Sequence, residues 1–226
     1  ATRDALALRV NAVVTMPMNK ASVNLAGVKF TGHTELIAAM CGVKNYAMMQ
    51  SSGHLRVAFV TTHIPLAEVS RYATFARIVE VTHLLEAVCR AEGVSRPRLA
   101  AAAINPHAGE NGFMGREDEE TVKPALAALR REGIDIAGPF PPDTLFLADT
   151  RQRFDGIVSM YHDQGHIPFK MLAFATGVNS TLGLPIIRTS PDHGTAFEIA
   201  WQGQADPRSV FAAVRVAALR AAAKEK

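Results

Sequence analysis

The sequence has 226 residues, with 24 Lys and Arg against 21 Asp and Glu, which gives a formal net charge of +3. Hydrophobic residues make up 48% of the chain and charged residues 20%, which excludes a disordered polypeptide and allows a sizeable core. No window approaches roughly 18 uninterrupted apolar residues, so we expect no membrane span. The small, dispersed positive charge does not predict a nucleic-acid partner.

Cysteine usage points to a reducing compartment. Cys41 and Cys89 are too few for a disulfide framework, and both lie in apolar, helix-like surroundings. The opening residues lack the basic start and long apolar stretch of a signal peptide. We therefore predict a cytoplasmic protein. The first residues resemble the middle of a domain, with a helix leading directly into a strand.

Short apolar runs alternate with longer amphipathic stretches along the chain, which is typical of βαβ units. Several runs are apolar on consecutive residues, as expected for strands covered on both faces. The pattern predicts an α/β protein. The predicted strands are Asn11–Thr15, Ala47–Gln50, Leu55–Thr61, Leu99–Ile104, Gly156–Met160 and Pro185–Thr189, and the predicted helices are Thr34–Met40, Leu66–Glu92, Glu117–Glu132 and Pro207–Ala223.

Three histidines directly follow predicted strand ends in polar, turn-forming sequences: His63, His107 and His162. In open α/β sheets, ligands bind beyond the carboxyl ends of strands, so the three imidazoles could converge. Three neutral imidazoles suit a divalent transition metal that keeps a position open for substrate. Each could equally be an ordinary loop or capping histidine, and the spacing alone does not decide between these readings.

Two further histidines lie at strand–helix junctions. His33 opens a predicted helix that Thr34 could cap, and the free N–H groups there would suit an anion, although a simple capping turn is as good an interpretation. His193 follows the strand ending at Thr189, and its small neighbours would let a ligand approach the backbone closely.

Three basic residues could complete an anion site. Lys20 and Lys170 could also be solvated surface charges, whereas Arg188 ends a buried-looking strand and is less easily explained as a surface residue. Beside a metal, such cations would suit a substrate that carries carboxylate and phosphate groups.

At these residues the sequence resembles the PdxA family, the 4-hydroxythreonine-4-phosphate dehydrogenases. The shared motifs occur in family order and cover nearly the whole chain. The resemblance implies a three-layer αβα fold like that of the isocitrate and isopropylmalate dehydrogenases, with two lobes sharing a cleft. The motifs are FTGHTE (Phe30–Glu35), TTHIPL (Thr61–Leu66), NPHAGE (Asn105–Glu110), GPFPPDTLF (Gly138–Phe146), MYHDQG (Met160–Gly165), GVNSTLGLPIIRTS (Gly177–Ser190) and DHGTAFEIA (Asp192–Ala200).

The resemblance also implies roles for individual residues. Lys170 is the expected proton-transfer or carboxylate-binding group, and Asp143 matches an active-site Asp. The implied metal ligands are His63, His107 and His162; the implied substrate contacts are His33, Thr34, Lys170, Asn179 and Arg188; the loop expected to face the dinucleotide is formed by Asp192, His193, Gly194, Thr195 and Ala196.

Two departures from the family pattern affect these expectations. A glycine-rich motif that family members carry about a hundred residues upstream is absent, so we expect an incomplete first lobe. On this interpretation residues 1–25 and 204–226 are the remnant of the cofactor-side lobe, and residues 26–203 bind metal and substrate. The segment 165–170 is more similar to relatives that act on phosphorylated threonate or erythronate.

The implied function is oxidation, with decarboxylation, of a small phosphorylated 3-hydroxy acid such as 4-phosphohydroxy-L-threonine, as in pyridoxal phosphate biosynthesis. The resemblance also implies NAD or NADP as cofactor, a divalent metal (Zn, Co, Ni, Mn or Mg), and a homodimer with the active site at the interface. The alternative substrates are 4-phospho-D-threonate and 4-phospho-D-erythronate. A three-histidine metal hydrolase or lyase, and a non-enzymatic fragment that binds metal and phosphate, remain further alternatives.

Overall fold

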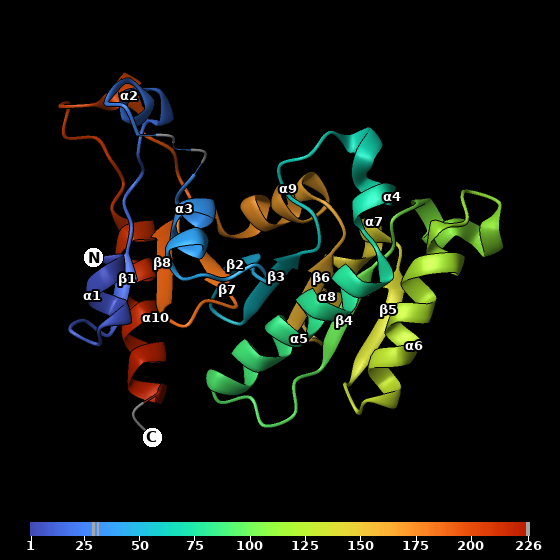
Figure 1. Cartoon of the computed structure of the whole chain (residues 1–226). Coiled ribbons are helices and arrows are strands. Elements are labelled where there is room, and N and C mark those ends of the chain that lie inside the picture. The colour runs from blue at the N-terminus through green and yellow to red at the C-terminus, as the bar shows by residue number, and fades with distance from the viewer. Residues whose placement is uncertain (29, 31, 225–226) are drawn as a thin grey trace.

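The computed structural model describes residues 1–28, 30 and 32–224; Thr31 of the FTGHTE motif and the last two residues of the basic tail lie outside the described residues. Its strands form one eight-stranded sheet in the order β1-β8-β7-β2-β3-β6-β4-β5 (Figure 1). The predicted α/β fold is confirmed. The strands are β1 (Ala12–Val14), β2 (Ala47–Ser52), β3 (Leu55–Phe59), β4 (Leu99–Ala102), β5 (Ile136–Phe140), β6 (Gly156–Ser159), β7 (Val178–Leu182) and β8 (Ile187–Pro191).

The sheet is mixed in direction. β3, β6, β4 and β5 are parallel neighbours, and β1 is parallel to β8. Between these two groups, β2 pairs antiparallel with β3 and β7, and β7 pairs antiparallel with β8. The prediction missed β5 and β7, whose sequences IAGPF and VNSTL interrupt the apolar pattern with Gly and Pro or with polar residues.

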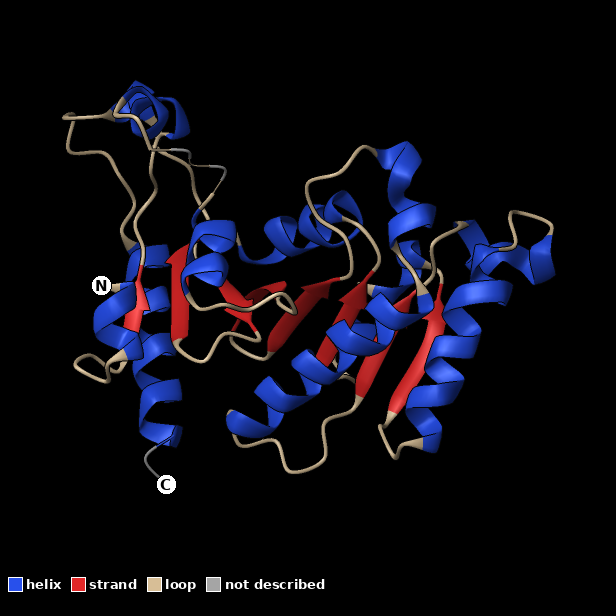
Figure 2. Cartoon of the chain, viewed as in Figure 1, coloured by secondary structure: helices blue, strands red, loops and turns tan. Residues whose placement is uncertain are grey.

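Helices cover both faces of the sheet (Figure 2), as expected for a three-layer protein. One face carries α5 (Phe75–Ala91), α6 (Lys123–Arg131) and α10 (Arg208–Lys224), and the other carries α3 (His33–Met40), α7 (Pro142–Leu145) and α9 (His162–Ala173). The remaining elements are α1 (Thr2–Leu6), α2 (Lys20–Leu25), α4 (Val69–Tyr72), α8 (Ala148–Arg151) and the short turns η1 (Leu66–Glu68), η2 (Pro106–Gly112), η3 (Asp118–Val122) and η4 (Phe197–Ile199).

The core follows from the two periodicities of the sequence. Residues of β2 alternate between faces, so Met49 packs under α5 while Met48 packs on the opposite side with Phe59 and Phe169. The helix α5 buries Ile78, Val81, Leu85 and Cys89, spaced three or four residues apart on one stripe.

One predicted helix has different boundaries in the structure, and one helix was not predicted. The helix predicted over Leu66–Glu92 is interrupted before Phe75, because the Thr74 side chain accepts a hydrogen bond from the Arg77 N–H and starts a separate helix. The segment after β6 was predicted as a turn, but its His162 is the first residue of α9, which contains Pro168.

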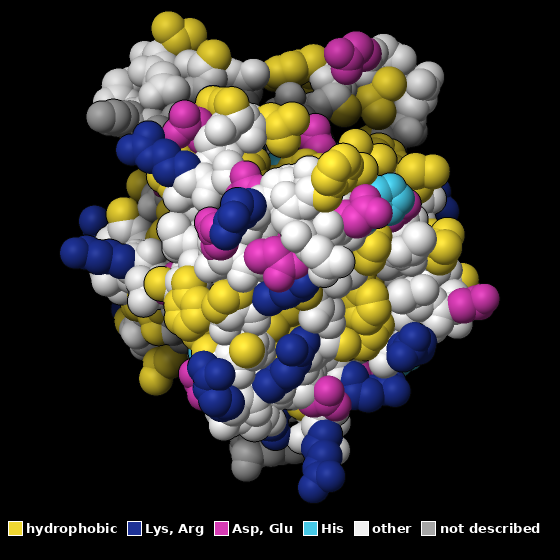
Figure 3. All heavy atoms as spheres, turned by 90° about the vertical axis from the view of Figure 1, so that its right-hand side faces the viewer, with side chains coloured by type: hydrophobic (Ala, Val, Ile, Leu, Met, Phe, Trp, Pro, Cys, Tyr) yellow, Lys and Arg dark blue, Asp and Glu magenta, His cyan; other side chains and the backbone are white. Residues whose placement is uncertain are grey.

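The face on the right-hand side of Figure 1 carries a mixed charge pattern. Figure 3 shows Lys and Arg side chains interspersed there with Asp, Glu and apolar side chains. Within the described residues, no helix combines the length and apolar character needed to span a membrane.

Candidate active site

The turns that carry the three histidines follow adjacent strands. β3, β6 and β4 are parallel neighbours, so their carboxyl ends lie at one edge of the sheet. The ring centroids of His63 and His162 are 5.7 Å apart. His107 is exposed on η2, and the described residues contain no group of three or more His, Cys, Asp or Glu placed to hold a metal. The structure therefore brings two predicted ligands together and leaves the third apart.

The backbone of η2, which carries His107, is unusual. From His107 to Asn111 the residues adopt positive φ angles, with φ 51° at His107 itself, so the chain does not continue from β4 as a helix. The fully buried Asp118 accepts hydrogen bonds from Ile104 N at 2.8 Å and Asn105 N at 3.0 Å. α7 packs against this loop and carries Asp143, which is also exposed.

His162 is held in a defined orientation. Its Nδ1 lies 2.6 Å from Asp163 Oδ1, and its ring stacks on His166 with centroids 3.9 Å apart. His166 in turn stacks on Phe59 at 4.1 Å. With Nδ1 engaged, Nε2 of His162 is left for a ligand, which is the usual arrangement of a metal-binding histidine.

Close packing places α9, and with it His162, on the sheet. A Cβ at Gly165 would lie 2.6 Å from Phe59 Cε1 and 2.9 Å from Ser159 Oγ, so only glycine lets the helix approach this closely. The buried Gln164 amide accepts from Met160 N and donates to Ala103 O, which ties the first turn of α9 to the segments after β6 and β4.

A buried arginine lies on the same face of the sheet. Arg188 is only 5% exposed, donates to Thr15 Oγ1 and Thr181 Oγ1, and forms no ion pair within the described residues. Burial lowers its pKa to about 10, while nearby Glu35 opposes the change. Burial also lowers the pKa of His33, and the positive charge of Arg188 lowers it further. His33 is therefore close enough to Arg188 to interact with it electrostatically. A desolvated guanidinium without an ion-pair contact favours an anionic ligand.

The expected cap of α3 was wrong. The helix begins at His33 with Gly32 at its N-cap, and no side chain caps it; Thr34 lies inside the first turn.

A second polar cluster lies where α9 passes β2 and the end of β8. Lys170 Nζ is 3.8 Å from Asp192 Oδ2, and Gln50 donates to Asp192 Oδ1. Burial raises the pKa of Asp192, against the effects of Lys170 and Gln50. Several buried atoms here have no hydrogen-bond partner, which is typical of a site that a polar ligand or water completes. They are Gln50 Oε1, Asn179 Oδ1, Asp192 Oδ2 and His193 Nε2.

A family model described as "Pyridoxal phosphate biosynthetic protein PdxA" matches residues 1–217. The chain belongs to the PdxA family. It is 51% identical over 214 residues to the 4-hydroxythreonine-4-phosphate dehydrogenase of Desulforapulum autotrophicum, which covers 94% of this chain and 63% of the relative. It is 45% identical to the D-threonate 4-phosphate dehydrogenase of Pectobacterium atrosepticum, over 96% of this chain and 67% of the relative.

Among solved structures, a 4-hydroxythreonine-4-phosphate dehydrogenase from Klebsiella pneumoniae superposes with a TM-score of 0.86 at 44% identity. The match covers 97% of this chain and 67% of that one. The chain thus spans 63% to 67% of the length of these PdxA proteins.

The paired histidines of this PdxA chain are chemically suited to a divalent metal. Partial desolvation lowers the pKa of His63, and His162 lowers it further, which favours the neutral imidazole that metals bind. The contact between His162 Nδ1 and Asp163 fixes the ring and leaves Nε2 for a metal. Within the described residues, this pair is not joined by a third His, Cys, Asp or Glu placed to hold a metal with them.

Two residues of this candidate site were not predicted from the sequence. Gln50 carried a signal, because it is a polar residue in the otherwise apolar strand sequence AMMQ. His166 had no predicted role, and its place between His162 and Phe59 depends on the helix α9.

The predicted cofactor loop follows β8 in this chain. Gly194, Thr195 and Ala196 are exposed, and Ala196 has φ 46°. The predicted helix over Pro207–Ala223 is confirmed as α10, and the turn η4 lies between it and His193, so His193 does not lead directly into an α-helix.

Proposed function

We propose that this chain carries the metal- and substrate-binding part of an NAD- or NADP-dependent dehydrogenase for a small phosphorylated hydroxy acid. The observation that carries the proposal is the buried Arg188, which forms no ion pair with any described residue and lies on the same face of the sheet as the paired imidazoles of His63 and His162. Its relatives, named as dehydrogenases of 4-hydroxythreonine 4-phosphate and D-threonate 4-phosphate, support the substrate class.

Arg188 and His33 would hold the acidic groups of the substrate. Arg188 is fixed by two threonine hydroxyls and presents its charge in a desolvated environment, where a charge-assisted hydrogen bond to phosphate or carboxylate is strong. Thr34, in the first turn of α3, and Asn179, with its unpaired Oδ1, would position the substrate's polar groups.

His63 and His162 would hold a divalent metal (Zn, Co, Ni, Mn or Mg) together with His107 from a second copy of the chain. A bound metal of this kind polarises substrate oxygens and stabilises negative charge that develops on them. The exposed position of His107, away from the other two, supports a homodimer in which each site takes residues from both protomers. Asp143, on α7 beside the His107 loop, would come to the site from the same protomer as His107.

Lys170 would move a proton at Nζ. It lies 3.8 Å from the buried Asp192 carboxylate, which holds it at the edge of the polar cluster. The loop from Asp192 to Ala196 would face the dinucleotide. We keep the proposed division into residues 26–203 for metal and substrate, and residues 1–25 with 204–226 for the cofactor side.

The substrate choice turns on the segment 165–170, which lies on α9 and places His166 against His162. We propose 4-phosphohydroxy-L-threonine as the substrate, with 4-phospho-D-threonate and 4-phospho-D-erythronate as the alternatives. The unpaired thiols of Cys41 and Cys89 agree with the cytoplasmic location that we propose.

A substrate panel tests the proposal. The three phosphorylated acids are each supplied with metal and with NAD or NADP, and nicotinamide absorbance is followed. We expect reduction of one nicotinamide with at least one acid, lost on complete metal removal and in His107→Ala. Metal-dependent release of phosphate or cleavage of the acid without nicotinamide reduction would instead establish the hydrolase or lyase alternative. Binding of metal and phosphate with no turnover would establish the non-enzymatic one.

A further inference from the structure

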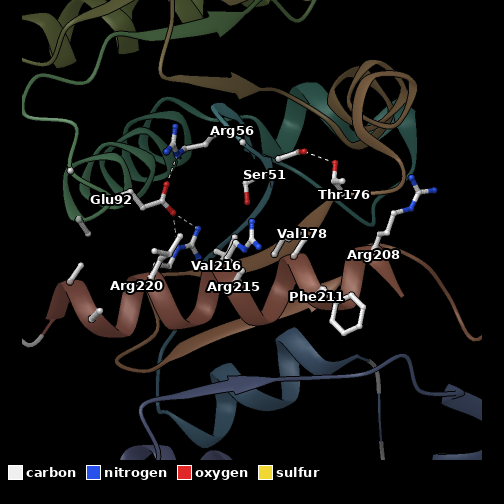
Figure 4. A pocket seen from close by; sticks show the side chains of 18 residues that line it. Ser51, Arg56, Glu92, Thr176, Val178, Arg208, Phe211, Arg215, Val216 and Arg220 are labelled. Carbon is white, nitrogen blue, oxygen red and sulfur yellow. Dashed lines mark hydrogen bonds and ion pairs between the residues drawn. The ribbon is translucent and has the colours of Figure 1, made fainter. Parts of the chain in front are cut away.

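A large cleft lies on the face of the sheet opposite α9. It encloses about 1010 Å³ between α10 and the end of α5 (Figure 4). Its floor is formed by the ends of β2, β3 and β7. The cleft therefore lies between α10 and α5, over the antiparallel strands that connect the two parallel parts of the sheet.

Strand register separates this cleft from the candidate active site. Ser51 pairs directly with Arg56 on β3 and with Val178 on β7, so these three side chains share one face. All three line the cleft. Gln50, the preceding residue, points to the other face and contacts Asp192 there. A ligand in the cleft would not touch the histidine cluster.

The charges lining the cleft are unevenly matched. Glu92 is a single carboxylate shared by two arginines, with Arg56 Nε 2.5 Å from Oε2 and Arg220 Nε 2.7 Å from Oε1. Arg208 pairs with Asp206 outside the cleft lining. Arg215 has no hydrogen bond or ion pair with any described residue. The cleft therefore contains more positive charge than its own carboxylate balances.

One buried polar group of the lining also lacks a hydrogen-bond partner. Ser51 is 5% exposed and its Oγ makes no hydrogen bond. Arg220 Nη2 forms an ion pair with Glu92 Oε1 at 2.7 Å. Figure 4 shows the Ser51 hydroxyl directed toward α10, and the Arg215 side chain rising from α10 into the same space. A buried hydroxyl without a partner is uncommon, and an acceptor between Ser51 and Arg215 would satisfy it.

Much of the remaining lining is apolar. Val178 projects from the sheet, and Val216, Leu219 and Phe211 from α10, with alanines and glycines between them. The other two polar side chains, Ser52 and Thr176, hydrogen-bond to each other. A pocket of this size with few convergent polar groups is typical of a small-molecule site. Its apolar walls require more than an inorganic ion, because an ion alone would leave them in contact with water.

We propose that this cleft binds a small amphipathic organic anion, whose phosphate or carboxylate lies between Ser51, Arg215 and Arg220 and whose apolar body lies against α10. The bound molecule would contact α10 on one side and the end of α5 on the other. The site is independent of the proposed dehydrogenase site and does not rest on that function.

Four probes test the site by calorimetry: phenyl phosphate, benzoate, inorganic phosphate and neutral benzyl alcohol. Hydrogen exchange read by mass spectrometry locates the bound probe. We expect phenyl phosphate or benzoate to bind and to protect peptides from 208–224 and 51–56. Inorganic phosphate and benzyl alcohol should each bind at least about tenfold more weakly, since each lacks one of the two interactions.

Arg215→Met should weaken the binding of the aryl anion about tenfold or more and abolish the protection of 208–224, since a hydrogen bond to a charged group is lost. Ser51→Ala should weaken it less. The matched control is Arg131→Met at the exposed end of α6, which should leave binding unchanged. Because Arg215 is exposed, its substitution should leave the fold intact, and the melting temperature checks this.

Three results would overturn the proposal. The first is protection confined to 162–170 and 188–192, with affinity unchanged in Arg215→Met. The second is equal binding of benzyl alcohol or inorganic phosphate, and the third is no binding of either aryl anion.

Discussion

The predicted active-site residues fall into two regions that differ in how they are held. On the α9 face, His162, Arg188 and Asp192 are fixed by stacking, burial and hydrogen bonds. At the end of β4, His107 and Asp143 are exposed, and within the described residues neither side chain has a polar contact. Only the backbone of the His107 loop is fixed, by Asp118.

This difference indicates which part of the site one chain completes by itself. The first region has polar atoms without hydrogen-bond partners and an arginine that forms no ion pair within the described residues, so a small polar ligand would complete it. The second region presents an imidazole to solvent on a defined loop, as expected of a group that acts on a neighbouring molecule. The following predictions test this distinction.

The largest effect is expected at Arg188. Arg188→Met should weaken binding of the phosphorylated acid that is turned over about 100-fold, because charge-assisted hydrogen bonds to the substrate are lost. The melting temperature should stay the same or rise, since an unpaired buried charge is removed. Calorimetry and thermal unfolding measure the two quantities, with Arg131→Met as the control. A large loss of stability with unchanged affinity would show that Arg188 has only a structural role.

Gly165→Ala tests how α9 supports the first region. The new Cβ would clash with Phe59 and Ser159, so we expect a loss of about 2 kcal/mol in the free energy of unfolding and weaker metal binding through displaced His162. Urea unfolding and metal titration are the measurements. Gly194→Ala is the matched control, because nothing lies within 4 Å of its Cβ position. Equal stability of the two variants would contradict the packing argument.

Asp118→Asn tests the second region alone. One of the two backbone N–H groups at the start of the His107 loop loses its acceptor, which should cost about 1 kcal/mol and increase hydrogen exchange at residues 104–112. Substrate binding to an isolated chain should not change. A loss of that binding would show that the two regions are coupled within one chain.

Asp192→Asn should have the smallest effect, and its sign depends on pH. The folded-state pKa of Asp192 is raised above 3.8, so its contribution to stability is present at acid pH and is lost as pH rises through that pKa. The stability of the variant relative to the native protein should therefore increase from acid to neutral pH. Urea unfolding across this range checks it. A relative stability that falls with pH would mean that Lys170 and Gln50 outweigh burial.

Much of the architecture followed from the sequence, because apolar runs and amphipathic stretches report burial directly. The strands β5 and β7 were missed because Gly and Pro in β5, and Asn and Ser in β7, interrupt the apolar pattern. The antiparallel pairing of β2 could not be predicted, because it depends on contacts between residues far apart in the chain. The start of α9 was missed because Gly165 and Pro168 suggest a turn, whereas the close packing on Phe59 requires that glycine.

The chemistry of the site was visible in residue types, but its assembly was not. Arg188 could be recognised from its position in an apolar strand, and its burial is confirmed. Gln50 was missed because its partner Asp192 lies 142 residues away. The run of positive φ angles from His107 to Asn111 was not predicted, because Ala108 and Glu110 seldom adopt them, although Gly109 and Asn111 favour them.

The most direct test of a shared site is metal binding by mixed dimers. His107→Ala and His63→Ala are prepared separately and then mixed, dissociated and reassembled, and Co²⁺ binding is followed by its visible absorption. Each variant alone should lack the high-affinity site. The mixture should regain about one quarter of the native sites, because half the dimers are mixed and each mixed dimer has one intact set of ligands. No recovery, or full metal affinity in His107→Ala alone, would contradict a site built from two copies of this chain.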